Sequence, residues 1–392
     1  MHKTTQAIQT PHPKRDAYGA LAMPVYHTAA YEFDTAARMV DAFTGKVLEP
    51  DYSRVMNPTV THLEDRVKAV TGAANVFAFN SGMQAITNAL LTVAESGKTI
   101  LTSNHLFGNT CSLITQTLAR LGIRSRTVDF TRPEAVAEAI DDTVCCFFLE
   151  ILTNPQLEVA DLRALSALAR RHGFPLIVDT TMIPFTEFSA ADLGVDIEVV
   201  SSTKYLSGGG TSLGGLVIDY GTFPQVNERI RFELLFTIGG YIAPHAAYMQ
   251  TLGLETLPAR YRVQSATALA LAERLQALPQ VQRVNYPGLA SHPAHDLARA
   301  QFGPTGGAML TIDLASEEAC HRFINTLQLV RRATNLFDNR TLAIHPYSTI
   351  FGNFTPQERA RMDVLPTTVR LSAGLEHVDD LFADLRQALI RL

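Results

Sequence analysis

Ile197-Glu198-Val199-Val200-Ser201-Ser202-Thr203-Lys204-Tyr205 is a run in which apolar residues give way to hydroxyl side chains and one amine, just before Ser207-Gly208-Gly209-Gly210. The run predicts a buried strand that ends near Lys204 and enters a glycine-rich loop. A lysine at a strand end can be partly desolvated, which lowers its pKa and leaves a neutral amine able to condense with a carbonyl. A lysine taken alone is more often simply exposed. The interpretation of Lys204 therefore depends on the residues that accompany it.

Short apolar runs alternate with helical patterns on both sides of this segment. The runs are 74–79, 99–103, 124–128, 143–149, 176–179, 197–201 and 215–218, with predicted helices at 133–140 and 162–172 among them. This alternation predicts an α/β fold whose mostly parallel, seven-stranded sheet is covered by helices. Ligands of such sheets bind beyond the carboxyl ends of the strands. The polar residues that follow the runs lie there: Asn80-Ser81-Gly82-Met83, Glu150, Asp179 and Lys204.

A chain of 392 residues is too long for a single ordinary hydrophobic core. Its composition, with 46% hydrophobic and 18% charged residues, is typical of a globular chain. Residues 1–58 are rich in turn formers and have little helical periodicity, which predicts an extended N-terminal arm that packs on something else. Residues 59–250 form the expected ligand-binding α/β domain. Residues 251–392 form a smaller C-terminal α+β domain, with strands at 281–286 and 308–313 and helices at 256–277, 317–327 and 378–390.

Several classes of partner are disfavoured by composition. Net charge is −5 and no long basic cluster occurs, so nucleic acid is not an expected partner. Neither an apolar leader nor a membrane-span pattern is seen, so a cytoplasmic location without membrane attachment is expected. The cysteines Cys111, Cys145, Cys146 and Cys320 are interpreted as small core residues, and no metal site is expected.

Pyridoxal 5′-phosphate (PLP) requires a lysine, a carboxylate that keeps the pyridine nitrogen protonated, donors for the phosphate and a group that stacks on the ring. Asp179 ends an apolar strand and suits the pyridinium, although an aspartate in that position is commonly a helix N-cap. Ser81, Gly82 and Met83 precede a predicted helix at 84–93, whose positive end can hold a phosphate. This chain therefore offers several of the groups that PLP needs.

Ser201 and Thr203 alternate along the strand end and can add hydroxyl donors to the same anion. Ordinary strand-edge hydroxyls are the alternative interpretation of these two residues.

Six motifs are typical of one enzyme family in combination: Tyr52-Ser53-Arg54 with Asn57-Pro58-Thr59, Ser81-Gly82-Met83, Glu150 with Asn154-Pro155, Asp179, Ser201-Ser202-Thr203-Lys204-Tyr205, and Val369-Arg370-Leu371-Ser372-Ala373-Gly374-Leu375-Glu376. Over nearly its whole length the chain resembles the Cys/Met-metabolism PLP-dependent enzymes. That group contains cystathionine γ-synthase, cystathionine γ-lyase, methionine γ-lyase and O-acetylhomoserine sulfhydrylase. The resemblance implies the PLP-dependent transferase fold of type I.

The resemblance also implies roles for individual residues. Lys204 would carry the cofactor and then move protons at the substrate's Cα and Cβ, and Asp179 would pair with the pyridine nitrogen. The phosphate would be held by Ser81, Gly82, Met83, Ser201 and Thr203. Glu150 and Asn154 would flank the ring face and its phenolic oxygen.

Two further implications concern the substrate and the assembly. Arg370 would bind the substrate's α-carboxylate through its planar guanidinium. Tyr52 and Arg54 would reach the phosphate of the neighbouring subunit, within a homotetramer that is a dimer of dimers.

Phe107, in Leu106-Phe107-Gly108-Asn109-Thr110, is the first departure from the family pattern, which has a tyrosine at this position. Phenylalanine keeps the stacking on the cofactor and loses an acid. For a poor leaving group this loss costs about 10²- to 10⁴-fold in rate, and for a good one far less.

The remaining departures concern the substrate pocket. Asn335-Leu336-Phe337-Asp338-Asn339-Arg340 replaces a Ser-Leu-Gly-Gly stretch, so Asn335 and Asp338 are candidate substrate-binding residues and Phe337 is expected to fill space. Gly209 stands where a histidine is usual, and Thr349-Ile350-Phe351 replaces a Thr-His pair. The pocket is therefore expected to differ from that of a standard methionine γ-lyase.

Three enzyme activities stay open on these grounds. The first is γ-elimination from an L-homoserine-type amino acid with a good leaving group, such as canavanine, whose guanidine could pair with Asp338, or a methionine-like substrate. The second is γ-replacement by an O-acetylhomoserine sulfhydrylase, and cystathionine chemistry is the third and less favoured. A binding protein without turnover is a minor alternative. So is a nucleotide-phosphate loop at 207–211, which lacks the Gly-x-x-x-x-Gly-Lys-Ser/Thr pattern.

Overall fold

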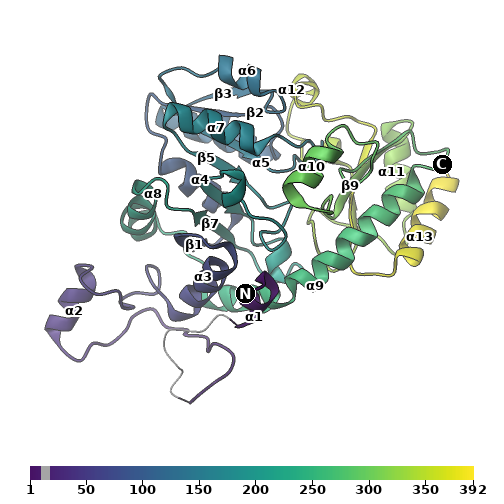
Figure 1. Cartoon of the computed structure of the whole chain (residues 1–392). Helices are drawn as coiled ribbons and strands as arrows, with labels where there is room; N and C mark the ends of the chain where they lie inside the picture. Colours follow the sequence, from purple (N-terminus) through teal and green to yellow (C-terminus); the bar gives the residue numbers. More distant parts are fainter. Residues whose placement is uncertain (10–17) are drawn as a thin grey trace.

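The structure is a computed structural model that describes residues 1–9 and 18–392. The chain forms two sheets and one long helix, α9 (Pro244–Leu275). In Figure 1 this helix extends from the region of the larger sheet to that of the smaller one. The larger sheet has the order β1-β7-β6-β5-β4-β2-β3. Its strands are β1 (Asn75–Phe79), β2 (Thr99–Ser103), β3 (Arg124–Val128), β4 (Val144–Glu150), β5 (Leu176–Asp179), β6 (Ile197–Val200) and β7 (Gly215–Asp219).

The larger sheet is mostly parallel, as the sequence predicts. Only β7 runs antiparallel to its neighbours, β1 and β6. Successive side chains of β4 point to opposite faces of the sheet, and both faces are buried. Phe147 and Leu149 pack with α7 (Leu162–His172) and α3 (Pro58–Thr71), whereas Cys146 and Phe148 pack with α4 (Gly82–Leu91). The result is a three-layer α/β unit with its core on both faces of the sheet.

The smaller sheet has the order β10-β11-β12-β9-β8. Its strands are β8 (Arg283–Asn285), β9 (Met309–Asp313), β10 (Arg331–Arg332), β11 (Leu342–Ile344) and β12 (Thr368–Ser372). It shares a buried cluster with the C-terminal half of α9, with α11 (Glu317–Thr326) and with α13 (Val378–Ile390). The other helices of this region are α10 (His295–Phe302) and α12 (Pro356–Arg361).

Two sequence expectations need correction. Helix α9 begins at Pro244, twelve residues before the predicted start, and so crosses the expected boundary at residue 250; the division into 59–250 and 251–392 stays a prediction. The arm is also not wholly extended, because it contains α1 (Lys3–Gln9) and α2 (Ala36–Phe43). Both helices are too short to give a clear periodicity.

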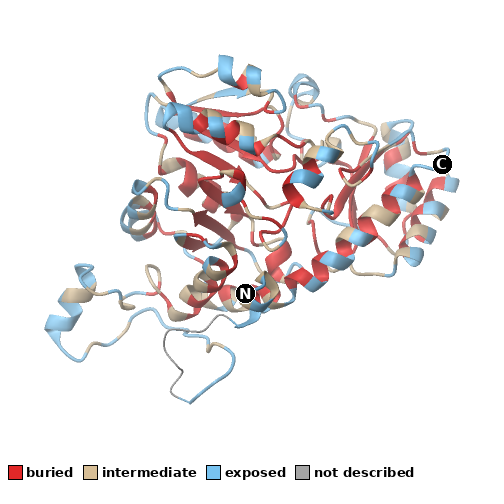
Figure 2. Cartoon of the chain, in the orientation of Figure 1, coloured by how far each residue is buried: buried red, intermediate tan, exposed pale blue. Residues whose placement is uncertain are grey.

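The two arm helices differ in what they contact. Helix α1 packs on its own chain, where Arg66 donates to the carbonyl of Ala7 at 2.9 Å and to Glu255 at 2.6 Å. Helix α2 projects away from the rest of the chain in Figure 1, and Figure 2 shows it largely exposed. Met39, Val40 and Phe43 are among its exposed apolar side chains. Across the described residues, no helix combines the length and apolarity needed to cross a membrane.

Candidate active site

The start of α4 forms a narrow cradle against the end of β6. Ser81 is its N-cap, and its hydroxyl oxygen accepts the N–H of Gln84 at 3.1 Å. A Cβ on Gly82 would lie 2.6 Å from Cβ and 2.7 Å from Oγ of Ser201, so only glycine fits. The amides of Gly82 and Met83 belong to the first turn, which has no acceptors within the helix. This end of α4 is chemically and sterically suited to a phosphate.

The two hydroxyls of the strand end do different things. Ser201 faces Gly82 in the cradle, and its own N–H donates to Oγ1 of Thr181 at 2.8 Å. The hydroxyl of Thr203 donates to the carbonyl of Gly214 at 3.1 Å and accepts the N–H of Gly214 at 3.0 Å. Ser201 thus lies next to the cradle, whereas the hydroxyl of Thr203 is engaged with Gly214; the role of either residue in binding a phosphate stays a prediction.

Two carboxyl groups lie side by side at the ends of β4 and β5, where Glu150 and Asp179 are register partners. Burial and the charge of Asp179 raise the pKa of Glu150 well above its usual range. Burial also raises the pKa of Asp179, while hydrogen bonds from Thr181 and the charge of Lys204 oppose the shift. We infer that Glu150 is the neutral member and Asp179 the ionised one, because only Asp179 has a cation beside it.

Asp179 is not a helix N-cap, since no α-helix follows it. Its Oδ1 accepts the N–H of Thr181 at 2.9 Å within a turn. Its charge therefore remains available to a protonated ring nitrogen.

Lys204 is half-buried rather than exposed. Its Nζ donates to Oδ1 of Asn335 at 3.0 Å. Burial, aided by the charge of Arg370, lowers the pKa of Lys204 to about 8, against the opposing charge of Asp179. A sizeable fraction of neutral amine near pH 8 is what condensation with an aldehyde requires.

Arg370, in β12, is a buried cation whose side chain has no carboxylate partner in the described part of the chain. Its Nη1 donates to Oδ1 of Asn154 at 3.1 Å, and its Nη2 to the carbonyls of Thr334 and Asn335 at 3.2 and 3.3 Å. Its Nε has no partner among the described residues. Burial lowers its pKa to about 9. An unpaired buried charge is costly, so this guanidinium is poised for an anion such as an α-carboxylate.

Asn335 joins the two cations of the site. Its side-chain oxygen accepts from Lys204 and its backbone carbonyl from Arg370. The side-chain oxygen of Asn154 accepts from the other guanidinium nitrogen of Arg370. Both asparagines therefore orient charged groups of the site.

Phe107 is the N-cap residue of α5 (Gly108–Ser112). Its N–H donates to Oε1 of Glu150 at 2.5 Å. This bond ties the aromatic position to the carboxyl pair at the strand ends. Behind it, a Cβ on Gly108 would lie 3.1 Å from the carbonyl of Ile350, so the segment at 350–354 closes over α5.

Phe337 fills space, as the sequence predicts, whereas the substrate-binding role of Asp338 stays a prediction. Phe337 is fully buried and its ring stacks on Tyr205, with centroids 3.9 Å apart. Oδ1 of Asp338 accepts from Nε of Arg340 at 2.7 Å and from the Arg340 N–H at 3.0 Å. Phe337 therefore packs beneath the lysine segment, and Asp338 is held in an ion pair within its own loop.

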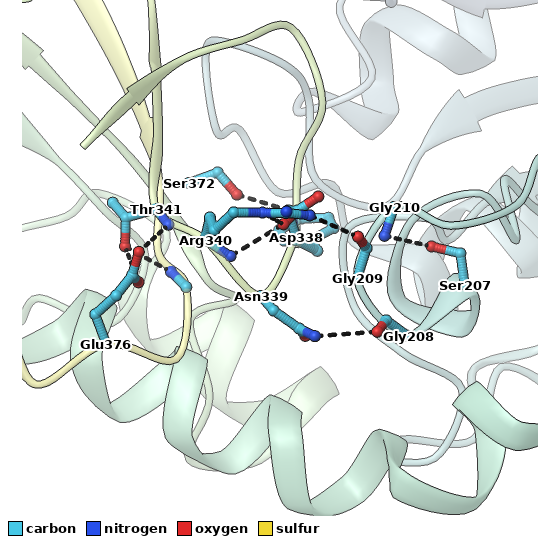
Figure 3. A network of polar contacts seen from close by, with 12 residues as sticks. Ser207, Gly208, Gly209, Gly210, Asp338, Asn339, Arg340, Thr341, Ser372 and Glu376 are labelled. Atoms are coloured by element: carbon cyan, nitrogen blue, oxygen red, sulfur yellow. Dashed lines mark hydrogen bonds and ion pairs between the residues drawn. The ribbon is translucent and has the colours of Figure 1, made fainter. Parts of the chain in front are cut away.

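Figure 3 shows that the same loop contacts the glycine-rich segment after Lys204. Asn339 donates to the carbonyl of Gly208 at 3.0 Å, and Arg340 donates to that of Gly209 at 2.9 Å. We call residues 335–340 the latch. Sequence reasoning missed Asn339 and Arg340, because no local pattern shows that they would meet a loop about 130 residues earlier.

Among the described residues, neither Tyr52 nor Arg54 is hydrogen-bonded to Lys204, whose amine bonds to Asn335. The Arg54 guanidinium stacks on the rings of Tyr52 and Phe236, at 5.4 and 5.8 Å, and donates to the carbonyl of Phe236. Tyr52 is 44% exposed. No contact of either residue with the cradle is present in the described chain, so their predicted action on a neighbouring subunit stays a prediction.

The strand-end lysine, the ionised Asp179, the helix-end cradle and the seven-stranded sheet together define a class of protein: PLP-dependent enzymes of fold type I. The residues present fit the cofactor, with Lys204 for its aldehyde, Asp179 for its ring nitrogen and the Gly82–Ser201 cradle for its phosphate.

A family model described as "Cys/Met metabolism PLP-dependent enzyme" matches residues 4–390. L-methionine gamma-lyase of Pseudomonas putida is 38% identical over 388 residues, covering 98% of this chain and 96% of its own. O-succinylhomoserine sulfhydrylase of Pseudomonas aeruginosa is 37% identical over 380 residues, covering 97% and 93%. A crystal structure described as an O-acetylhomoserine (thiol)-lyase of Campylobacter jejuni, with a pyridoxyl-lysine, matches with a TM-score of 0.96, 32% identity and full coverage of both chains.

The chain therefore belongs to the family of Cys/Met metabolism PLP-dependent enzymes. Its general chemistry is PLP-dependent elimination or replacement at the γ position of an amino acid.

Proposed function

We propose that the protein catalyses γ-elimination from an L-homoserine-type amino acid whose γ substituent is a good leaving group, giving a homoserine-type or 2-oxo acid product. The observation that carries the proposal is Phe107. Its backbone N–H donates to Glu150, and its side chain has no acidic hydrogen that could protonate a leaving group. A substituent that leaves as a stable anion needs no proton from that position.

The chain's own residues supply the other steps. Arg370 binds the α-carboxylate, because it is a buried cation without an anionic partner among the described residues. Lys204 moves protons at Cα and Cβ, since its lowered pKa of about 8 suits both acceptance and return. Asp179 keeps the ring nitrogen protonated, and PLP when bound supplies an electron sink for the negative charge that develops on the substrate.

γ-Replacement, as in an O-acetylhomoserine sulfhydrylase, is the second candidate. The same phenylalanine favours it, because acetate also leaves without a proton. Relatives of comparable identity include an L-methionine gamma-lyase and an O-acetyl-L-homoserine sulfhydrylase 1 of Thermus thermophilus. Phe107 therefore indicates which kind of group leaves the γ carbon, but it does not distinguish elimination from replacement.

The sequence suggests canavanine as a specific substrate, because its guanidine could pair with Asp338. That carboxylate is already paired with Arg340 at 2.7 Å, so the cationic end of canavanine would have to compete with Arg340. We accordingly place O-acyl substrates and methionine-like substrates beside canavanine in the test.

The test is a product survey of the PLP-loaded protein with canavanine, methionine and O-acetylhomoserine, each with and without sulfide. We expect a homoserine-type or 2-oxo acid product from at least one substrate without sulfide. Homocysteine as the dominant product, with no 2-oxo acid, would overturn the elimination proposal in favour of replacement. Lys204→Ala is the control and must abolish either product.

We also propose a homotetramer built from dimers that share active sites. The support is the exposed apolar surface of α2, together with Tyr52 and Arg54, neither of which is hydrogen-bonded to Lys204 among the described residues.

A further inference from the structure

Outside the active site, three possible metal ligands converge on the surface of the C-terminal α+β region. Glu317 and His321 lie one turn apart on α11, and His345 directly follows β11. One ligand atom from each of the three lies within 4.8 Å of the others. The sequence predicts no metal site here, because the two histidines are separated by 23 intervening residues and form no recognisable motif.

The two imidazoles already have the separation that a metal ion needs. Nε2 of His321 is 3.2 Å from Nδ1 of His345. Two nitrogens bound to one tetrahedral zinc at about 2.05 Å are themselves about 3.3 Å apart. Glu317 lies four residues before His321 on α11, so its carboxylate is on the same face of the helix.

His345 is oriented as metal-binding histidines usually are. It is buried, and its Nε2 lies 2.8 Å from the carbonyl of Pro366. A carbonyl can only accept, so Nε2 carries the proton in the neutral ring and the lone pair is on Nδ1. That lone pair points toward His321 and toward Oγ of Ser348, 2.8 Å away. Such a fixed tautomer, with the second nitrogen on a backbone carbonyl, is the usual outer support of a histidine ligand.

Space remains for further ligands. A cavity of about 400 Å³ adjoins the cluster and is lined by both histidines, Ser348, Thr334 and Arg332. Water can therefore complete the coordination shell, and Ser348 can bond to it. The guanidinium of Arg332 is engaged with the carbonyls of Ile324 and Asn325 at the end of α11, which partly offsets its repulsion of a cation.

We propose that Glu317, His321 and His345 form a binding site for one divalent transition-metal ion of the zinc type on each chain. Two nitrogens and one carboxylate oxygen favour zinc, cobalt or nickel over magnesium or calcium, which prefer oxygen ligands. An ion there would tie α11 to the end of β11. Ile344 of β11 pairs with Arg370, so the site is one residue away from the strand partner of the proposed carboxylate-binding arginine.

The test is calorimetric titration of the PLP-loaded protein, freed of metal by a chelator, with Zn²⁺ and separately with Mg²⁺. We expect saturable binding of one Zn²⁺ per chain and none of Mg²⁺. His321→Ala and Glu317→Gln, both at solvent-accessible positions, are expected to weaken Zn²⁺ binding at least about tenfold. His377→Ala is the matched control, because His377 is also exposed beside a carboxylate, 3.7 Å from Asp379, and belongs to no group of three metal-binding side chains among the described residues.

Cobalt(II) distinguishes this site from other ligands on the chain. A visible spectrum without an intense thiolate band, together with an unchanged cofactor band, would support the His/Glu site. A thiolate band would place the ion on cysteine and overturn the proposal. Absence of saturable Zn²⁺ binding, or binding that His321→Ala leaves unchanged, would do the same and would leave the two histidines as an ordinary hydrogen-bonded pair.

Discussion

Lys204 and Arg370 are two cations at one site, connected through Asn335. Each charge disfavours the other, and burial disfavours both. The resting arrangement is therefore one in which Lys204 readily gives up its proton, whereas Arg370 awaits an anion. An incoming amino acid supplies that anion through its α-carboxylate, while its amine meets Lys204.

The pH dependence of cofactor binding follows from this arrangement. Only the neutral amine attacks an aldehyde, so the rate at which cofactor-free protein binds PLP should fall about tenfold per pH unit below a midpoint near 8 and level off above it. Arg370→Leu removes a neighbouring positive charge and should move the midpoint to higher pH. Stopped-flow absorbance between pH 7 and 11.5 measures both. A midpoint near 10.5, the ordinary lysine value, would mean that Lys204 is exposed.

The substitution Phe107→Tyr tests whether the side chain at position 107 determines which leaving groups the enzyme can use. Restoring a phenol should raise kcat/KM for methionine, whose methanethiolate leaves less readily than acetate, by about tenfold or more, and leave kcat/KM for O-acetylhomoserine nearly unchanged. Steady-state assays with both substrates give the ratio directly. An equal change for both substrates would show that position 107 acts through packing and not through proton transfer.

The latch, residues 335–340, is the element that most distinguishes this chain's site. In succession it contacts Lys204 through Asn335, Tyr205 through Phe337, Gly208 through Asn339 and Gly209 through Arg340. The glycine-rich loop that follows the lysine is thus fastened to the C-terminal region by side chains. Positive φ values at Gly208, Gly209 and Gly210 let this loop turn tightly enough to present its carbonyls.

Arg340→Ala should release that loop. Arg340 holds both Asp338 and the carbonyl of Gly209, so its loss should speed amide exchange of residues 207–211 by about tenfold while β6 and β7 keep their protection. Hydrogen-exchange mass spectrometry provides the measurement. Arg322→Ala is the control, since within the described residues the Arg322 guanidinium donates to the carbonyl of Arg391, near the C-terminus and outside the latch. Unchanged exchange at 207–211 would mean that the glycines alone hold the loop.

Much of the fold is predictable from the sequence, because a sheet buried on both faces leaves apolar runs that alternate with helices. The bounds of β2, β3, β5, α7 and α13 match the sequence prediction residue for residue. Helix α9 was predicted too short because the buried face of its N-terminal half carries polar Gln250 and Thr251 and therefore shows no continuous apolar stripe. Helices α1 and α2 were missed because seven or eight residues give little periodicity.

The site was predictable to a smaller extent. The strand-end positions of Glu150, Asp179 and Lys204 follow from the sheet rule, and their convergence could be expected. The ion pair of Asp338 with Arg340, the stacking of Phe337 on Tyr205 and the His321–His345 contact depend on how distant segments pack. Such contacts leave no signal in the local sequence.

At the scale of the assembly, shared active sites can be tested by complementation. Lys204→Ala and Arg54→Ala should each be inactive alone, because one removes the lysine and the other the neighbour's phosphate contact. If sites are shared, unfolding and refolding the two variants together should restore about a quarter of wild-type activity, through mixed dimers with one complete site. Refolding each variant separately is the control. No recovery in the mixture would show that each chain builds its own site.

The most direct test of the account is to trap the cofactor on the protein by borohydride reduction and to map the modified peptide by mass spectrometry. The chain has only six lysines, and Lys204 is the sole lysine after Lys98. We predict one pyridoxyl group per chain, on Lys204, and no trapped cofactor in Lys204→Ala. A pyridoxyl group on another lysine, or none on the PLP-loaded protein, would contradict the account.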